Sequence, residues 1–172
     1  MNRFKKLLVV VLGLVLGASA QGRESDPTVV PAVDFNRYAG FWYDIARNPS
    51  YFQNKCLHSI AEYAVLTETS VSVKNTCYQD EGKVTRIEGV ATVKDVNQSA
   101  KLRVKFSFFQ RGDYWITELD PNYEWAVVSG PHKKSLFILA RYAPMDKNLL
   151  ASILATLQSK GFDTSQLIYD QY

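Results

Sequence analysis

The sequence predicts an all-β protein, an antiparallel sandwich or barrel of eight strands with one α-helix packed outside it. Three observations indicate this. Eight short β-like runs follow one another at nearly regular spacing, turn-forming residues separate them, and an amphipathic helical pattern follows the last run. Short strands divided by turn residues are typical of antiparallel sheets, and links too short for helical crossovers favour hairpin pairing.

The first 20 residues have the pattern of a secretory signal peptide. A basic start precedes an apolar run over residues 7–17, and the small residues 18–20 form a cleavage pattern. We expect cleavage after this segment, and an uncleaved membrane anchor is the alternative. Residues 21–33 are polar and punctuated by proline, which predicts an extended N-terminal arm. Residues 34–172 then form the domain.

The charge balance changes once the signal segment is set aside. The whole chain has 20 Lys plus Arg and 17 Asp plus Glu, and three of the cations but no acid lie in the first 20 residues. The remaining chain therefore carries 17 charges of each sign. Nucleic-acid binding needs a concentrated positive patch, so we expect no nucleic-acid partner.

The first strand begins at an unusual pair of residues. Gly40 allows a tight backbone turn because it has no side chain, and Trp42 buries a large flat surface two positions later. The expected strands, in order, are residues 41–47, 58–66, 71–78, 84–94, 101–109, 114–119, 124–129 and 135–142. Between the fifth and sixth of these, the turn is expected at residues 111–113.

The helix is expected directly after the eighth strand. Asp146 is a good N-cap, Lys160 lies in the last turn, and Gly161 is placed to end the helix. Its leucine and isoleucine residues fall on one stripe, which would pack on the outside of the sheet. Residues 165–170 are expected to add a short extra strand.

Two cysteines, Cys56 and Cys77, remain in an exported chain, a pattern that favours a disulfide. Two free thiols, one of them reactive, are the alternative. A turn at residues 68–69 would place Ile60 opposite Cys77, so the expected strand register does not by itself bring the two sulfur atoms together.

Residues that would carry catalysis are scarce. His58 and His132 are the two histidines, and neither has metal-ligand spacing. We find no nucleophile elbow and no phosphate-binding glycine loop, so we expect no enzyme activity, no metal and no cofactor. The alternative enzyme hypothesis uses the Cys56 thiol as a nucleophile, which requires a nearby base.

Three separated landmarks resemble those of the lipocalin family. The first is Asn36 to Tyr43 around Gly-x-Trp, the second is Leu119 to Tyr123, and the third is Leu139-Ala140-Arg141 before the helix. The second match is partial, because Leu119 replaces the usual Thr and one extra residue intrudes. The resemblance implies an eight-stranded antiparallel up-and-down barrel with a C-terminal helix outside. It also implies that five residues have structural roles: Gly40, Trp42, Asp120, Tyr123 and Arg141. In the family the Arg lies across the Trp ring, so Arg141 is expected over Trp42.

The segment Trp42 to Arg47 and several later stretches are similar to the bacterial lipocalin and apolipoprotein D-like branch. This implies binding of a fatty acid or lysophospholipid in the barrel, in connection with the cell envelope. Many bacterial members are outer-membrane lipoproteins, but no Cys follows the signal segment here. We therefore expect a periplasmic or secreted protein, with outer-membrane association and peripheral membrane contact as further possibilities.

The resemblance, together with strand alternation anchored on Arg141, implies a set of inward-facing residues. The expected ligand-binding residues are Phe52 at the mouth, and Ala61, Val73, Gly89, Val104, Phe106, Tyr114, Ile116, Ala126, Val128, Phe137 and Leu139 inside. Plain core packing is the alternative for each of them. If their side chains filled the barrel completely, the protein would be a structural or interaction module and not a carrier. Such a module could act as a homodimer.

Overall fold

The computed structural model describes residues 25–108 and 110–172. The expected signal segment, residues 1–20, lies outside the described part of the chain, as does the side chain of Phe52. Within the described ranges, no helix is both long and apolar enough to cross a membrane.

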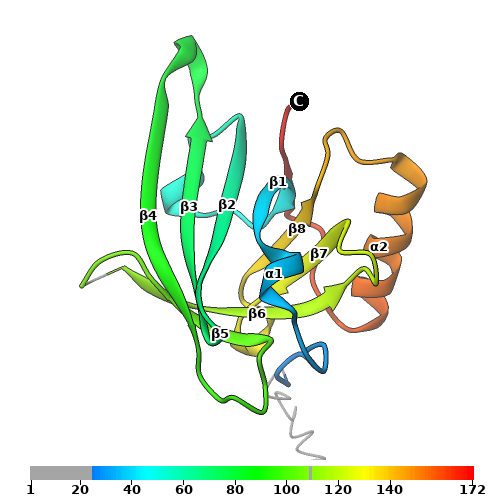
Figure 1. Cartoon of the computed structure of the whole chain (residues 1–172). Helices are drawn as coiled ribbons and strands as arrows, with labels where there is room; N and C mark the ends of the chain where they lie inside the picture. Colours follow the sequence, from blue (N-terminus) through cyan, green and yellow to red (C-terminus); the bar gives the residue numbers. More distant parts are fainter. Residues whose placement is uncertain (1–24, 109) are drawn as a thin grey trace, which may run out of the picture.

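The described strands form a closed antiparallel barrel with a helix on its outside (Figure 1). Neighbours along the chain pair as hairpins from β2 to β8, and β1 pairs with both β8 and β2, which closes the sheet. The barrel strands are β1 (Gly40–Arg47), β2 (His58–Thr67), β3 (Ser70–Tyr78), β4 (Val84–Val93), β5 (Lys101–Lys105), β6 (Arg111–Leu119), β7 (Trp125–Ser129) and β8 (Leu136–Ala140). The eight-stranded barrel predicted from the sequence is confirmed.

The C-terminal elements agree with their prediction. Helix α2 (Lys147–Ser159) begins after Asp146, whose carboxylate accepts hydrogen bonds from the backbone N–H groups of Asn148 and Leu149, both at 2.9 Å. Gly161 follows with φ +77°, the left-handed conformation that ends many helices. Strand β9 (Ile168–Tyr169) then adds to the edge of β1.

Helix α2 covers one side of the barrel and creates a second apolar layer. Its residues Ile153 and Leu157 pack on the outward side chains of β7 and β8, among them Val127 and Ile138. Both strands are therefore apolar on both faces. Burying a single such side chain stabilises the fold by about 1.5–3 kcal/mol.

Two expectations about the strands were wrong. The turn expected at residues 111–113 is not there, because β5 already ends at Lys105 and β6 begins at Arg111. Gln110 explains the shift, because its carbonyl accepts the N–H groups of Phe106 and Ser107 at 2.8 and 3.3 Å and closes the hairpin there.

The register of β2 and β3 also differs from the expected one. An irregularity between Val65 and Thr67 shifts the pairing by one residue, so Ser59, not Ile60, lies opposite Cys77. The shift brings Cys56 one position closer to its partner.

The segment before β1 contains an element that the sequence did not predict. Short helix α1 (Phe35–Tyr38) is capped by Asp34, and its Phe35 and Tyr38 are buried. The described part of the expected N-terminal arm has no helix or strand, but it is tied to the barrel. Val30 donates its N–H to the carbonyl of Ile116 at 3.0 Å, and the arm thereby lies against the interior cluster near Trp42.

Candidate functional site: the barrel cavity

The barrel encloses a cavity of about 450 Å³. This lies within the range of about 300–1,000 Å³ that is typical of small-molecule sites. Its wall includes residues from η1 (Tyr51–Gln53) and from the loop between β5 and β6. These segments lie at the end of the barrel opposite Trp42, so the cavity occupies the upper part of the barrel and the indole lies beneath it.

Most of the expected interior residues line this cavity. They are Ala61, Val73, Val104, Phe106, Tyr114, Val128, Phe137 and Leu139. They come from six different strands, β2, β3, β5, β6, β7 and β8, or, for Phe106, from the turn directly after β5. Alternation anchored on Arg141 placed Phe137 and Leu139 inward, and the family resemblance placed the other six; in the structure all eight line the cavity.

Three expected residues face inward without lining the cavity. Ile116 and Ala126 are fully buried and belong to the apolar cluster around Trp42, below the open space. Gly89 pairs with the cavity residue Val73, but a Cβ there would lie 2.8 Å from the Phe106 ring and 2.5 Å from the Lys105 carbonyl oxygen. The Phe106 ring therefore occupies the place where a side chain of residue 89 would be.

The closed end of the barrel is built around Trp42. Its indole N–H donates to the carbonyl of Tyr38 at 2.8 Å, and the Arg141 guanidinium lies 3.9 Å from the ring centre. Gly40 has φ +96°, and a Cβ on it would meet Arg141 at 3.3 Å. The arrangement implied by the family resemblance, an Arg across the Trp, is present.

The other two motif residues hold the loop between β6 and β7. The Asp120 carboxylate accepts the N–H groups of Asn122 and Glu124, at 2.8 and 3.3 Å. Tyr123 takes φ +62°, its hydroxyl accepts the N–H of Asp34 at 3.0 Å, and its ring stacks on Arg37. This loop thereby attaches α1 to the closed end.

Three tyrosine hydroxyl groups meet inside the barrel. Tyr38 and Tyr114 share a hydrogen bond of 2.7 Å, and Tyr114 donates to Tyr63 at 2.9 Å. Burial raises the pKa of all three phenols well above the ordinary value, so they remain neutral. Two of them, Tyr63 and Tyr114, line the cavity, so their hydroxyl groups lie among its apolar side chains.

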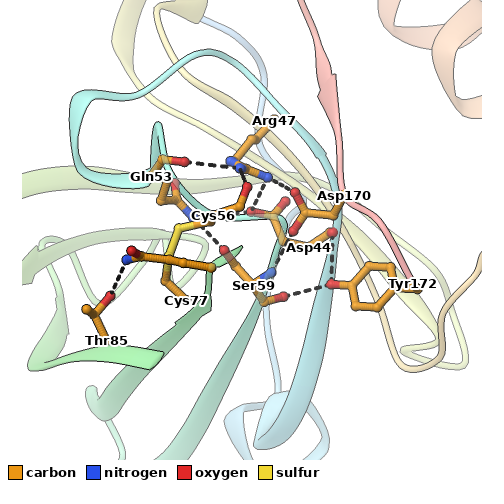
Figure 2. The surroundings of a disulfide bond; sticks show 10 residues. Asp44, Arg47, Gln53, Cys56, Ser59, Cys77, Thr85, Asp170 and Tyr172 are labelled. Atoms are coloured by element: carbon orange, nitrogen blue, oxygen red, sulfur yellow. Dashed lines mark hydrogen bonds and ion pairs between the residues drawn. A yellow bond between two sulfur atoms is a disulfide. The ribbon is translucent and has the colours of Figure 1, made fainter. Parts of the chain in front are cut away.

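Three charged side chains, Asp44, Arg47 and Asp170, lie together at the end of β1 nearest the cavity mouth. None of them was predicted as a site residue from the sequence. Asp44 lines the cavity, and its Oδ2 accepts a hydrogen bond from Gln53 at 3.3 Å and lies 3.9 Å from Arg47. Arg47 in turn forms an ion pair with Asp170, and all three charged groups are buried (Figure 2). Burial raises the pKa of Asp44 to about 7, although Arg47 and Gln53 act in the opposite direction. Strand alternation could have found Asp44, because it lies two residues after the inward-facing Trp42.

Cys56 and Cys77 form a disulfide, which confirms the sequence prediction. The bond attaches the loop after β1 to the upper end of β3, beside the charged cluster (Figure 2). Because both sulfurs are bonded, Cys56 is not available as a nucleophilic thiolate. Among the described residues, no group of three His, Cys, Asp or Glu side chains is placed to hold a metal ion.

The fold and this cavity define a class of protein: a small closed β-barrel with an internal cavity at one end. Comparison with known proteins agrees, since a family model described as a lipocalin-like domain matches residues 33–172. The chain belongs to the lipocalin family, whose members bind small hydrophobic ligands and are generally binding or transport proteins.

Similar sequences come from bacteria, plants and animals. The chain is 37% identical to the outer membrane lipoprotein Blc of Vibrio cholerae over 150 residues, which is 84% of this chain and 86% of the relative. It is 34% identical to temperature-induced lipocalin-1 of Arabidopsis thaliana, covering 81% and 79% of the two chains. With guinea pig (Cavia porcellus) apolipoprotein D the identity is 29%, over 94% and 90%.

Among solved structures, insecticyanin from the tobacco hornworm Manduca sexta has a similar fold. The TM-score is 0.67 at 22% identity, with 86% of this chain and 84% of the other covered. This likeness shows the shared barrel.

Proposed function

We propose that the protein binds and carries a single-tailed lipid, a fatty acid or lysophospholipid, in the barrel cavity. The cavity itself is the observation that supports this: about 450 Å³, with an apolar wall below and polar groups above. Such a gradient suits a molecule with one hydrocarbon chain and one polar end. Burial of the chain would supply about 25 cal/mol per Å² of apolar surface.

Titration with a fluorescent fatty acid, followed by displacement with lysophospholipid, tests this function. Val104→Phe offers a cavity-filling variant. Val104 lines the cavity and pairs with Gly112 on the neighbouring strand, where a Cβ would meet nothing within 4 Å, so the larger ring finds space there. We expect this variant to weaken binding about tenfold or more. The matched control is Val90→Phe, since Val90 is exposed on the outer face of β4.

A flat titration with folded wild-type protein would contradict the proposal, as would equal loss of binding in the Val104→Phe and Val90→Phe variants. Native mass spectrometry of gently purified protein gives a second measurement. It reports both a retained lipid and the presence of a homodimer.

We propose export to the periplasm or beyond the cell, with contact to the outer membrane, as the setting of this function. A disulfide suits an oxidising compartment, and the Vibrio cholerae relative is an outer membrane lipoprotein. Tyr51 and Phe108, on two loops at the cavity end of the barrel, are 85% and 76% exposed. Aromatic side chains there are suited to a peripheral membrane contact. Cosedimentation with lipid vesicles tests this, and Tyr51→Ser with Phe108→Ser should reduce it.

A further inference from the structure

We propose that Tyr63 and Tyr114 form a crossbar that limits the length of the hydrocarbon chain held in the cavity. The crossbar would stop the methyl end of a bound lipid, so the protein would discriminate among fatty acids by chain length. This inference rests on the proposed lipid-binding function and assigns its specificity.

Tyr63 and Tyr114 reach each other across the interior of the barrel. Tyr63 lies on β2 and Tyr114 on β6, and the order of the strands around the closed barrel places β2 and β6 on opposite sides. Tyr114 donates a hydrogen bond to the Tyr63 hydroxyl at 2.9 Å, and the two ring centres are 5.9 Å apart. The pair therefore spans the interior from wall to wall.

The cavity ends at the level of this crossbar. Both tyrosines line the cavity, and the open space lies on the side of the crossbar that faces the mouth. Three inward residues nearer the closed end are buried in the packed cluster and do not line the cavity: Val71, Leu102 and Ile116. The crossbar thus separates an open space from a filled one, as the floor of a binding site does.

The crossbar is supported from below by a third tyrosine. Tyr38, the last residue of α1, shares a hydrogen bond of 2.7 Å with Tyr114, and its ring centre lies 5.5 Å from that of Tyr63. Tyr38 is buried and packs on Trp42, with ring centres 4.8 Å apart. A chain that pushed the crossbar aside would break buried hydrogen bonds, which opposes such a movement.

The crossbar suits the methyl end of a lipid and not its polar end. Each of the three hydroxyl groups already has a hydrogen-bond partner among the other two. Burial raises the pKa of all three phenols, so the floor carries no charge. A ligand therefore gains little by bringing a polar group to the floor, and its polar end is better placed at the mouth, beside residues such as Gln53 and Gln110.

A fixed floor has a measurable effect on affinity. Each methylene group that leaves water should tighten binding about fourfold. Once the chain reaches the crossbar, a further methylene group has to remain in water at the mouth, and the gain stops. Affinity should therefore rise with chain length up to one member of a series and then level off.

Saturated fatty acids with even chains, from octanoic to octadecanoic acid, provide the test. Each acid displaces a neutral naphthylamine dye from wild-type protein at concentrations below micelle formation. We expect affinity to rise about fourfold per methylene group and to level off within the series. A rise that continues to octadecanoic acid would overturn the proposal.

Tyr63→Ala removes one half of the crossbar. The chain length at which affinity levels off should then move at least to the next acid of the series. Tyr114→Leu removes the other half and should act in the same direction. If folded Tyr63→Ala levels off at the same acid as wild-type protein, the crossbar does not set the limit.

Two further variants serve as controls. Ile116→Ala makes space below the crossbar, where the chain does not reach, so the limit should remain. An equal shift in Ile116→Ala would contradict the proposal, because interior volume would then set the limit. Tyr63→Phe keeps the ring and should also keep the limit. A uniform loss of affinity at every chain length in Tyr63→Phe would show that the hydroxyl binds the polar end of the ligand, and this would overturn the assigned orientation.

Dodecanoic acid with bromine on its terminal carbon gives a test without substitutions. In a crystal of wild-type protein with this acid, the anomalous signal of bromine locates the end of the chain. We expect it beside the rings of Tyr63 and Tyr114, and bromine at the mouth would overturn the proposal. This measurement remains decisive even if the variants do not fold.

Failure of this proposal and failure of the proposed function give different results. If neither the dye nor any fatty acid binds to folded wild-type protein, the lipid-carrying function is wrong. If the acids bind but affinity does not level off within the series, the carrier function stands and the role of the crossbar is wrong.

Discussion

The guanidinium group of Arg141 lies over the ring of Trp42, with its carbon 3.9 Å from the ring centre. The same group donates hydrogen bonds to the carbonyls of Phe41, Arg37 and Tyr123, at 2.9, 2.7 and 3.2 Å. One side chain therefore joins the end of β8 to α1, to β1 and to the loop before β7.

Arg141→Ala is expected to lower the free energy of unfolding by about 2–4 kcal/mol, since it removes a cation–π contact and several charge-assisted hydrogen bonds. Arg141→Lys should recover only part of this loss, because an ammonium cannot reproduce the planar fork. Urea unfolding followed by tryptophan fluorescence measures both. Arg103→Ala, which breaks an exposed ion pair with Asp113, should cost about 1 kcal/mol or less. Equal losses for Arg141→Ala and Arg103→Ala would contradict this role.

The disulfide should contribute measurably to stability. Cys56 and Cys77 are 21 residues apart, and closing a loop of this length contributes about 3 kcal/mol in the chain-entropy model. Replacing both with alanine should lower the urea midpoint, and a reducing agent should lower the wild-type midpoint in the same way. The double variant should not respond to the reducing agent. If the reducing agent lowered the urea midpoint of the double variant as well, its effect on the wild-type protein would not come from this disulfide.

Asp44 should make stability depend on pH. Its pKa rises from 3.8 in the unfolded chain to about 7 in the folded protein because it is buried. Between these values the folded protein holds a proton that the unfolded chain releases. Stability relative to Asp44→Asn should therefore fall as the pH rises from about 4 to about 7, by about 2–4 kcal/mol, and then level off. Unfolding curves of both proteins across this range measure the difference. A difference that grows with pH would contradict the assigned pKa.

Two glycines on inward-facing positions should respond differently to substitution by alanine. A Cβ at Gly89 would approach the Lys105 carbonyl oxygen to 2.5 Å, whereas a Cβ at Gly112 meets nothing within 4 Å. Gly89→Ala should lower the free energy of unfolding by about 1–3 kcal/mol through overpacking. Gly112→Ala should be neutral or slightly stabilising, because alanine loses less conformational freedom on folding. Thermal unfolding of the two variants makes the comparison, and similar melting temperatures would contradict the steric account.

Local patterns in the sequence were sufficient to predict most of the architecture. Strand alternation, turn residues and the Asp146 cap each depend on neighbours close in the chain, and these elements are confirmed. The pairing of Arg141 with Trp42 came from family resemblance and is also present. Helix α1 was missed because four residues carry too short a pattern to detect.

The missed part of the site depends on contacts between distant residues. Asp170 reaches Arg47 because β9 lies along β1, and no local pattern reports that pairing. The shifted register at Val65 and Thr67, which brings Cys56 within reach of Cys77, is likewise invisible to period-two alternation. Asp44 was within reach of the alternation argument, but its buried charge becomes evident only with its neighbours in place.

The barrel wall is uneven in thickness. Strands β7 and β8 are enclosed on both faces, by the interior cluster and by α2, while β4 is exposed along much of its length. Local opening is rarer where more apolar contacts must separate. The amide protons of Val127 and Ile138 should therefore exchange with solvent last, and those of the first half of β4 early. The side of the wall formed by β2, β3 and β4 lies away from the apolar layer under α2, so we expect it to open more readily than the side that α2 covers.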